Sequence, residues 1–368
     1  MERRRALADE ALAIAERSGD DAVIVWVLNH TANPSQDPTR LERALELSAD
    51  ALERAKRIGD PVLLMFAGWV RAETASRGLD IDEMDRCCRI VEAVAEQLDQ
   101  PMLTWRYTYL RAMRAQIAGD IDEAEALATE AFGIGTESGQ PDVTSIFGAQ
   151  TVMVHAERGT LGDLVPLLEQ MAADAPDIAG AITSALAVAH AEADRDEDAR
   201  RLLDEFAATG FALPVDQLWL TGMTSYAESA VAVGDPVYAE PLFDRLAPWA
   251  DQLATDGVAT AQGPVRHLLG GLATVLGRYD VAEAHFARAE EFNHRVGAKY
   301  FAARTNLWRG RMLVERAAAG DAERARTMLT EAHASASAHG YGTVERRAAA
   351  LLRRLDGRRQ EPPGASHG

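Results

Sequence analysis

Cysteine, lysine and aromatic residues are scarce in this chain of 368 residues. The two cysteines, Cys87 and Cys88, are adjacent, so they cannot build a disulfide framework or a four-ligand zinc site. Aromatic residues make up only 6% of the chain. Neither of its two lysines, Lys56 and Lys299, follows a turn of the form G-x-x-x-x-G-K-[ST]. The sequence therefore contains no P-loop to hold the phosphates of a nucleotide.

Long apolar segments and an excess of positive charge are also missing. Apolar runs such as residues 23–28 are far shorter than the roughly 20 residues that span a bilayer. The charged residues 1–5 do not lead into the apolar stretch of a signal peptide. Acidic residues outnumber basic ones by 57 to 38, and a net charge of −19 argues against general binding of nucleic acid. We therefore expect an acidic, cytoplasmic protein that binds neither membranes nor nucleic acid directly.

Residue types for catalysis or metal binding do not converge. The segment 364–368 matches the motif G-x-S-x-G, but it lies in a polar tail after two prolines. A nucleophile elbow needs a strand before the serine and a helix after it, and neither is expected there. No group of histidine, cysteine and carboxylate residues has the spacing of metal ligands. We therefore expect no catalytic site, no metal, no cofactor and no enzymatic activity.

What the sequence does contain is a regular series of turn signals. Pro61, Pro101 and Pro141 lie 40 residues apart, and each begins an apolar helical stretch, where proline suits the first turn. A second set of breaks, which includes Gly119 and Gly159, falls between them. Two breaks in each period of about 40 residues indicate two helices per repeat, an αα-hairpin that is stacked many times.

The second helix of each unit has a recurring apolar pattern. A leading residue is followed by apolar residues four and seven positions later, which places all three on one helix face. Eight of the nine units keep the pattern, and the remaining one has Ser48 in the middle position. The leading residues are Ala8, Ala44, Met84, Ala124, Leu164, Ala199, Ala239, Ala282 and Ala325. Twelve residues earlier, six of eight units carry Ala or Gly, as close helix pairing requires.

This pattern predicts an all-α fold, a right-handed α-solenoid of about eight to nine helical hairpins over residues 1–357. Residues 358–368 are predicted to be a disordered polar tail. The solenoid begins at residues 2–18 with a helix of the second type that lacks its partner. Such a half repeat is typical of a fragment of a longer protein, and it is equally typical of a helix that caps the solenoid. Both interpretations stay open at this point.

One run of residues resembles the tetratricopeptide (TPR) signature in its usual spacing. It consists of Leu269-Gly270, Gly277, Tyr279, Ala282, Phe286 and Ala289, and its second half recurs as Gly320, Ala325, Leu329 and Ala332. TPR-like spacing covers nearly the whole chain, although a period nearer 40 than 34 implies longer helices or turns. Residues 269–355 are also similar to the closing TPR-like region of large bacterial ATP-binding regulators. Those proteins are of the LuxR or maltose-regulator type, or are cyclase-linked ATPases.

The TPR resemblance implies a binding face on the concave side, lined mainly by the first helix of each pair. Projection of the repeat places aromatic and polar residues of three successive units there: Trp26, Asn29, Phe66, Trp69, Glu73, Arg106, Tyr109, Met113 and Gln116. Later units contribute fewer residues, among them Met153, Ser184, Thr224, Glu228 and His267. Aromatic residues and arginine are enriched where protein partners bind. An aromatic stripe at helical spacing is also typical of packing between helices.

These observations favour a non-catalytic scaffold that takes a peptide or protein partner in its concave groove. The alternative is the effector-sensing C-terminal arm of an ATP-dependent bacterial transcription regulator, which would bind a small-molecule effector. The two hypotheses differ in the ligand they predict for the same face.

Overall fold

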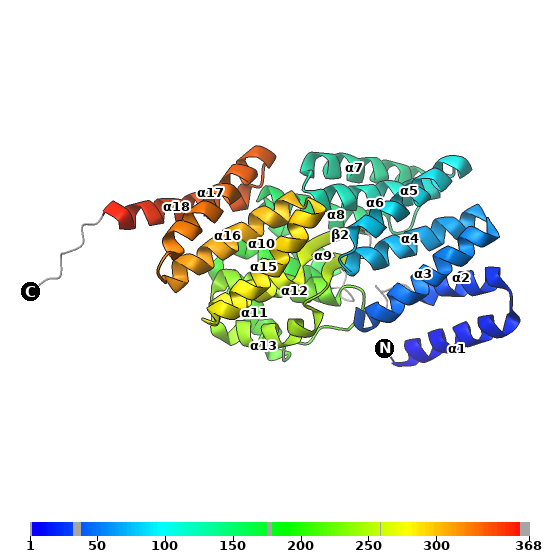
Figure 1. The fold of residues 1–368 in the computed structure, drawn as a ribbon, viewed down its shortest axis with the longest axis horizontal. Coiled ribbons are helices and arrows are strands. Elements are labelled where there is room, and N and C mark those ends of the chain that lie inside the picture. The colour runs from blue at the N-terminus through cyan, green and yellow to red at the C-terminus, as the bar shows by residue number, and fades with distance from the viewer. Residues whose placement is uncertain (1, 32–37, 175–178, 258, 361–368) are drawn as a thin grey trace, which may run out of the picture.

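The computed structural model describes residues 2–31, 38–174, 179–257 and 259–360, which form an all-α solenoid with one inserted β-hairpin (Figure 1). The helices of the first half are α1 (Glu2–Ser18), α2 (Asp21–Thr31), α3 (Leu41–Ile58), α4 (Pro61–Arg77), α5 (Ile81–Leu98), α6 (Pro101–Ala118), α7 (Ile121–Glu137), α8 (Val143–Arg158) and α9 (Val165–Asp174). Those of the second half are α10 (Ala179–Glu192), α11 (Asp196–Ala208), α12 (Trp219–Val233), α13 (Pro236–Leu246), α14 (Val265–Val275), α15 (Tyr279–Val296), α16 (Lys299–Arg316), α17 (Asp321–His339) and α18 (Gly342–Gln360). Short 3₁₀ turns precede α3 (η1, Pro38–Arg40) and α9 (η2, Leu161–Leu164) and follow α13 (η3, Ala247–Trp249).

The predicted breaks act as helix ends and helix starts. At the first of them, Gly59 adopts a left-handed conformation that ends α3, and Pro61 occupies the first turn of α4. The Asp60 side chain accepts hydrogen bonds from the backbone N–H groups of Val62 at 2.8 Å and Leu63 at 2.9 Å. This cap satisfies donors that have no partner within the helix.

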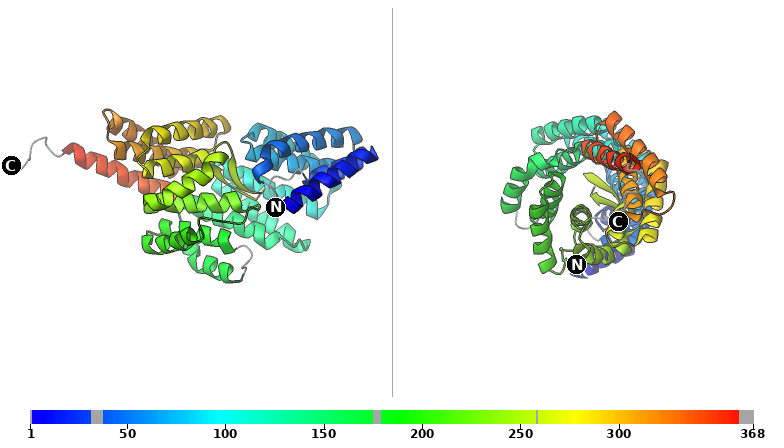
Figure 2. Two further views of the ribbon diagram at one scale, coloured as in Figure 1. Left: turned by 90° about the horizontal axis from the view of Figure 1, so that it is seen from below. Right: turned by 90° about the vertical axis from the view of Figure 1, so that its left-hand side faces the viewer.

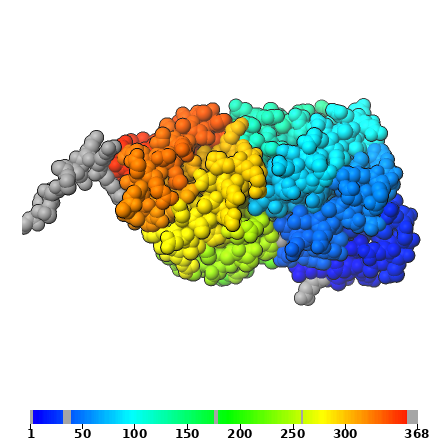
Figure 3. Space-filling model, in the orientation of Figure 1, coloured from blue at the N-terminus to red at the C-terminus, as the bar shows by residue number. Residues whose placement is uncertain are grey.

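Helices that follow one another in the chain pack against one another, beginning with α1 on α2, except that α8 and α9 are connected mainly through the intervening η2. The pair α14 and α15 shows why the recurring pattern is needed. Phe286 is fully buried, and a Cβ added to Gly270 would lie 2.6 Å from its ring. The small residue predicted at this position therefore lets the paired helices approach closely. In the space-filling view the units cover one another in chain order, from α1 at one end to α18 at the other (Figure 3).

The solenoid turns far enough to contact itself. Helix α6 packs against α16, and α8 packs against α18, although about 180 residues separate the members of each pair. The Tyr341 hydroxyl donates a 2.7 Å hydrogen bond to the Gly119 carbonyl, and the Arg346 guanidinium donates one of 3.2 Å to the Gly159 carbonyl. Viewed along its length, the molecule is a ring of helices (Figure 2). The concave face consequently lines the inside of this ring, which we call the channel.

A β-hairpin lies inside this channel (Figure 2). Its antiparallel strands are β1 (Leu253–Asp256) and β2 (Thr260–Pro264), with an irregular register between Ala254 and Thr255. The hairpin packs against α4, α6, α8, α12 and α14. The repeat pattern placed only a break at Asp256-Gly257, so the two strands were not predicted.

The C-terminal end of the described chain lies close to the predicted boundary of the solenoid. Helix α18 continues to Gln360, three residues past the predicted end of the solenoid at 357, and residues 361–368 of the predicted tail lie outside the described residues. Within the described part of the chain, no helix combines the length and apolar character that a membrane crossing requires.

Candidate binding site

The structure brings four of the predicted groove residues together. The Arg106 guanidinium carbon lies 5.7 Å from the ring centre of Phe66 and 5.2 Å from that of Trp69, which are cation–π distances. An Arg106 N–H donor lies 3.5 Å from the Tyr109 hydroxyl oxygen. Helices α4 and α6 therefore contribute an aromatic and cationic cluster.

The other predicted groove residues have different surroundings. Trp26 is 54% exposed and its ring lies 4.5 Å from that of His30 on the same helix. Asn29 is buried, and Glu73 and Met113 are completely inaccessible. Tyr109, in the cluster, is also only 2% exposed. A partner can therefore reach Trp26 and the half-buried Phe66, Trp69 and Arg106. Binding at these residues stays a prediction.

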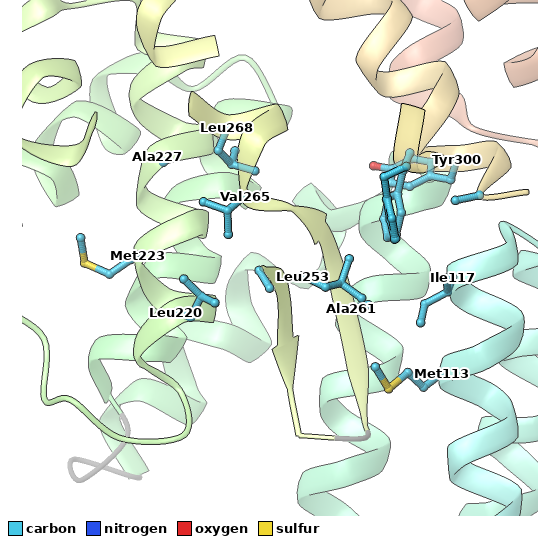
Figure 4. Close-up of a cluster of buried hydrophobic side chains, with 14 of the residues drawn as sticks. Met113, Ile117, Leu220, Met223, Ala227, Leu253, Ala261, Val265, Leu268 and Tyr300 are labelled. Atoms are coloured by element: carbon cyan, nitrogen blue, oxygen red, sulfur yellow. The ribbon is translucent and has the colours of Figure 1, made fainter. Parts of the chain in front are cut away.

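The hairpin occupies the inner part of the channel, as an extended ligand would. In the close-up, Leu253 of β1 faces Leu220 and Val265, whereas Ala261 of β2 faces Met113 and Ile117 of α6 (Figure 4). All six side chains are buried. The hydrophobic contacts of the channel wall are thus completed by a segment of the same chain.

Glutamine side chains bind the backbone of the hairpin. The Gln116 amide donates to the Ala261 carbonyl at 2.6 Å and accepts from the Ala261 N–H at 2.9 Å, as the next strand of a sheet would. The Gln150 amide donates to the Ala259 carbonyl at 3.1 Å and to the Tyr109 carbonyl at 3.0 Å. The wall of the channel therefore satisfies backbone groups at the outer edge of β2.

Helix α12 binds the hairpin from the opposite side. Thr221 donates to the Thr255 carbonyl at 3.1 Å, and Thr224 donates to the side-chain carbonyl of Gln262. The Gln262 amide in turn donates to the Ser225 hydroxyl at 3.1 Å. Gln116 and Thr224 were both predicted to face inward, and both contact the hairpin.

Beyond the hairpin the channel leaves a cavity. Its volume, measured as the space open to the centres of water-sized molecules, is about 60 Å³, which is room for roughly four to six waters. The lining comes from α8, η2, α10, α12, β2, α16 and α18. The apolar part of the wall consists of Val152, Met153, Ala156, Leu161, Ala185, Val188, Ala191, Ala232, Leu307, Trp308 and Val344. The polar part consists of Glu192, Ser225, Glu228, Gln262, Tyr300, Arg304, Thr343 and Arg347.

Arg304 links the cavity to the hairpin. It is 6% exposed, donates to the Gln262 carbonyl at 2.7 Å and forms a 3.3 Å ion pair with Glu228. Its Nε atom is buried and has no hydrogen-bond partner. A buried N–H donor without a partner costs about 1–3 kcal/mol, so an acceptor placed here by a ligand would be stabilised.

Glu192 is a half-buried carboxylate on the cavity wall. It accepts hydrogen bonds from the Leu161 N–H at 3.0 Å and from the Thr343 hydroxyl at 2.7 Å. The pKa of Glu192 is raised to about 7, chiefly by burial and also by the neighbouring charge of Glu228, while the hydrogen bonds from Thr343 and Leu161 and the charge of Arg347 lower it. Among the described residues, no arginine or lysine lies within ion-pair distance of Glu192.

A second acid, Glu157 on α8, is buried. One carboxyl oxygen accepts a 2.6 Å hydrogen bond from the Gln116 amide, and the other has no hydrogen-bond partner. Burial raises the pKa of Glu157 to about 8. The described residues contain no group of three or more His, Cys, Asp or Glu side chains placed to hold a metal ion. The arrangement is therefore suited to binding through hydrogen bonds, charge and apolar contact.

Sequence reasoning missed part of this site. Glu228 and Met153 were predicted to face inward, and both line the cavity. Glu192, Arg304 and Arg347 were not predicted to face inward. A lone charged residue in an amphipathic helix gives no sequence signal of burial, because contact between distant units creates the cavity.

Comparison with known proteins adds little to this description. No protein-family model matches the chain, and no curated protein is similar to it. Among solved structures it is similar to a circular tandem repeat protein with novel repeat topology and enhanced subunit contact surfaces. The identity is 14%, the match covers 97% of this chain and 88% of that one, and the TM-score is 0.16. A TM-score this low carries no argument, so the assignment to helical repeat folds rests on the sequential helix packing described above.

Proposed function

We propose that this chain is a non-catalytic, TPR-like binding scaffold whose ligand enters the open part of its channel. The observation that carries the proposal is the cavity between α8, α10, α12, α16 and α18, where the concave faces of distant units meet. Apolar walls surround a few convergent polar groups there, as in most ligand sites. The ligand is a chain end of a peptide or protein partner, or a small molecule of similar size.

The hairpin decides which part of the concave face is available. It covers Met113 and fills the channel beside α6 and α8, so a long extended peptide cannot lie along the whole wall. A partner chain instead enters with one end in the cavity. The exposed Trp26 and the half-buried Phe66, Trp69 and Arg106 remain a second surface for a protein partner, at the N-terminal end of the solenoid.

Thermal unfolding of the full chain tests the proposal. We would measure the melting temperature with a panel of small molecules and short peptides of different charge. A ligand that binds only the folded state raises the melting temperature by mass action. We expect some members to do so, and we expect Ala185→Phe, which places a ring in the cavity, to remove the shift. The control is Ala126→Phe on the exposed face of α7, which should keep it.

Two results would contradict the proposal. One is that no member of the panel raises the melting temperature. The other is a shift that survives in Ala185→Phe while this variant remains folded by circular dichroism, because the ligand would then bind outside the cavity.

A second candidate function is effector sensing, as in the C-terminal arm of an ATP-dependent bacterial transcription regulator. The observation that favours it is that the hairpin confines the free space to the dimensions of a small molecule. This candidate expects the stabilising members of the panel to be metabolites rather than peptides. It also expects binding of that metabolite to change the affinity of the chain for an ATPase domain.

A further inference from the structure

We propose that the cavity recognises a primary ammonium group with an adjoining carbonyl on a small apolar body. This chemistry is found at the N-terminal residue of a peptide and in a free amino acid or its amide. The inference rests on the proposed function and names the class of ligand for the same cavity. Three features of the wall carry it: two carboxylates, one buried donor without a partner, and an apolar pocket beside them.

The carboxylates indicate a cation. Glu192 of α10 and Glu228 of α12 both line the cavity, and the negative charge of Glu228 lies close enough to act on Glu192. Glu228 is shared with Arg304, whereas Glu192 has hydrogen bonds but no ion pair among the described residues. Even a partly buried carboxylate is destabilised when no cation is paired with it. An ammonium group between these two residues would supply the missing charge and up to three donors.

The arginines do not turn the cavity into an anion site. The Arg304 charge is paired with Glu228, and an Arg347 N–H donates a 3.2 Å hydrogen bond to the Ala191 carbonyl. What Arg304 still lacks is a hydrogen-bond acceptor for its buried Nε. A neutral carbonyl meets this need without adding negative charge beside two acids. The net charge of −19 also favours the approach of cations over anions.

The apolar wall sets the size of the ligand. Leu307 and Trp308 of α16 lie on one side of the cavity, and Val188 of α10 contributes from another helix. Trp308 adds an aromatic face, which attracts cations as well as hydrocarbon. A branched aliphatic side chain such as that of leucine matches this lining and leaves the ammonium group free to face the acids.

Isothermal titration calorimetry of the full chain tests the inference with matched probes. L-leucinamide carries the ammonium group and the carbonyl, N-acetyl-L-leucinamide lacks the ammonium group, and isopentylamine lacks the carbonyl. We expect L-leucinamide to bind and each of the other two to bind about tenfold more weakly or worse, because a hydrogen bond to a charged group is lost. Equal binding of N-acetyl-L-leucinamide would overturn the inference.

Substitution of the carboxylate gives the second arm. Glu192→Gln keeps an acceptor for Leu161 and Thr343 but removes the charge, so the affinity for L-leucinamide should fall about tenfold or more. The control is Glu130→Gln, the same chemical change on the exposed face of α7, which should leave the affinity unchanged. An unaltered affinity in a folded Glu192→Gln variant would refute the role of this residue.

The remaining measurements distinguish peptide ends from metabolites as the ligand. They also distinguish failure of the ammonium inference from failure of the scaffold function on which it rests. Binding of a pentapeptide with N-terminal leucine as tightly as L-leucinamide assigns the site to peptide ends, and binding of the small probes alone assigns it to a metabolite. If the panel contains ligands whose effect Ala185→Phe removes, but no ammonium compound among them, the scaffold function stands and the ammonium inference fails. If no ligand of any class binds, both fail.

Discussion

Replacement of Gln116 by leucine is expected to release the hairpin from the channel wall. The two side chains have similar volume, but leucine cannot form the amide's hydrogen bonds to Ala261 or to Glu157. Gln116 is 4% exposed and Ala261 is fully buried, so water cannot easily replace the lost partner. Both the N–H and the C=O of Ala261 would be left without hydrogen bonds.

The size of the effect follows from these contacts. Each buried polar group without a partner costs about 1–3 kcal/mol, so the two backbone groups together cost about 2–6 kcal/mol. This cost falls on the hairpin first, because repeat proteins open locally as well as globally. An increase of 2 kcal/mol in the free energy of the closed hairpin raises its opening equilibrium about 30-fold.

Hydrogen exchange measured by mass spectrometry is the suitable assay. We expect the amides of residues 253–264 to exchange at least about 30-fold faster in Gln116→Leu, while those of the outer helices change little. Gln97→Leu is the control, because Gln97 is exposed on α5. Equal protection of the hairpin in the two variants would refute the reasoning, since the glutamine amide would then contribute nothing to holding β2.

Two further changes test the buried acid and the ring closure. Glu157→Gln should become more stable relative to the native chain as the pH rises. The raised pKa means that the folded state binds more protons than the unfolded state between the ordinary value of 4.5 and about 8. Native stability therefore falls with pH in this window, by at most about 1.4 kcal/mol per pH unit from this group, and urea unfolding at pH 5, 7 and 9 should show a difference that grows and then levels off. A constant difference would mean that Glu157 ionises normally. Gly119→Ala should destabilise the chain by about 2 kcal/mol more than Gly59→Ala, although both glycines have a positive φ, of 81° and 76°. A Cβ at Gly119 would lie 2.5 Å from the Tyr341 hydroxyl, whereas none of the surrounding atoms lies within 4 Å of one at Gly59. Equal melting temperatures of the two variants would show that the contact between Gly119 and Tyr341 does not constrain the ring.

The repeat register could be predicted from the sequence because the packing of each helix pair depends on local residue spacing. Ala282 and Phe286 are fully buried, as their recurrence predicts, and Gly270 provides the close approach that the pattern required. The inward projection was also informative, since Gln116 and Thr224 face the channel. These predictions need only the helical period and the order of units.

The channel could not be predicted from the sequence, because its formation depends on contacts between distant units. Contact between Tyr341 and Gly119 depends on small rotations that accumulate over many units, and no single unit encodes their sum. The β-hairpin did leave a signal. Asp256-Gly257 lies between short alternating segments, which is a typical hairpin turn. Interpreting it only as a break between helices assumed that the repeat continued through it.

The hairpin and the cavity are consequences of the same closure. A solenoid that contacts itself turns its concave face into an interior, where polar groups need partners that water no longer supplies. The hairpin supplies them for Gln116 and Gln150 in one part of the channel. Beyond β2 the wall continues with Arg304 and Glu192. Among the described residues, the Nε of Arg304 has no hydrogen-bond partner, and the carboxylate of Glu192 has hydrogen bonds but no ion pair. The position of the hairpin therefore determines which groups of the wall are left without partners, and the end of the channel that it leaves open is the place to look for a ligand.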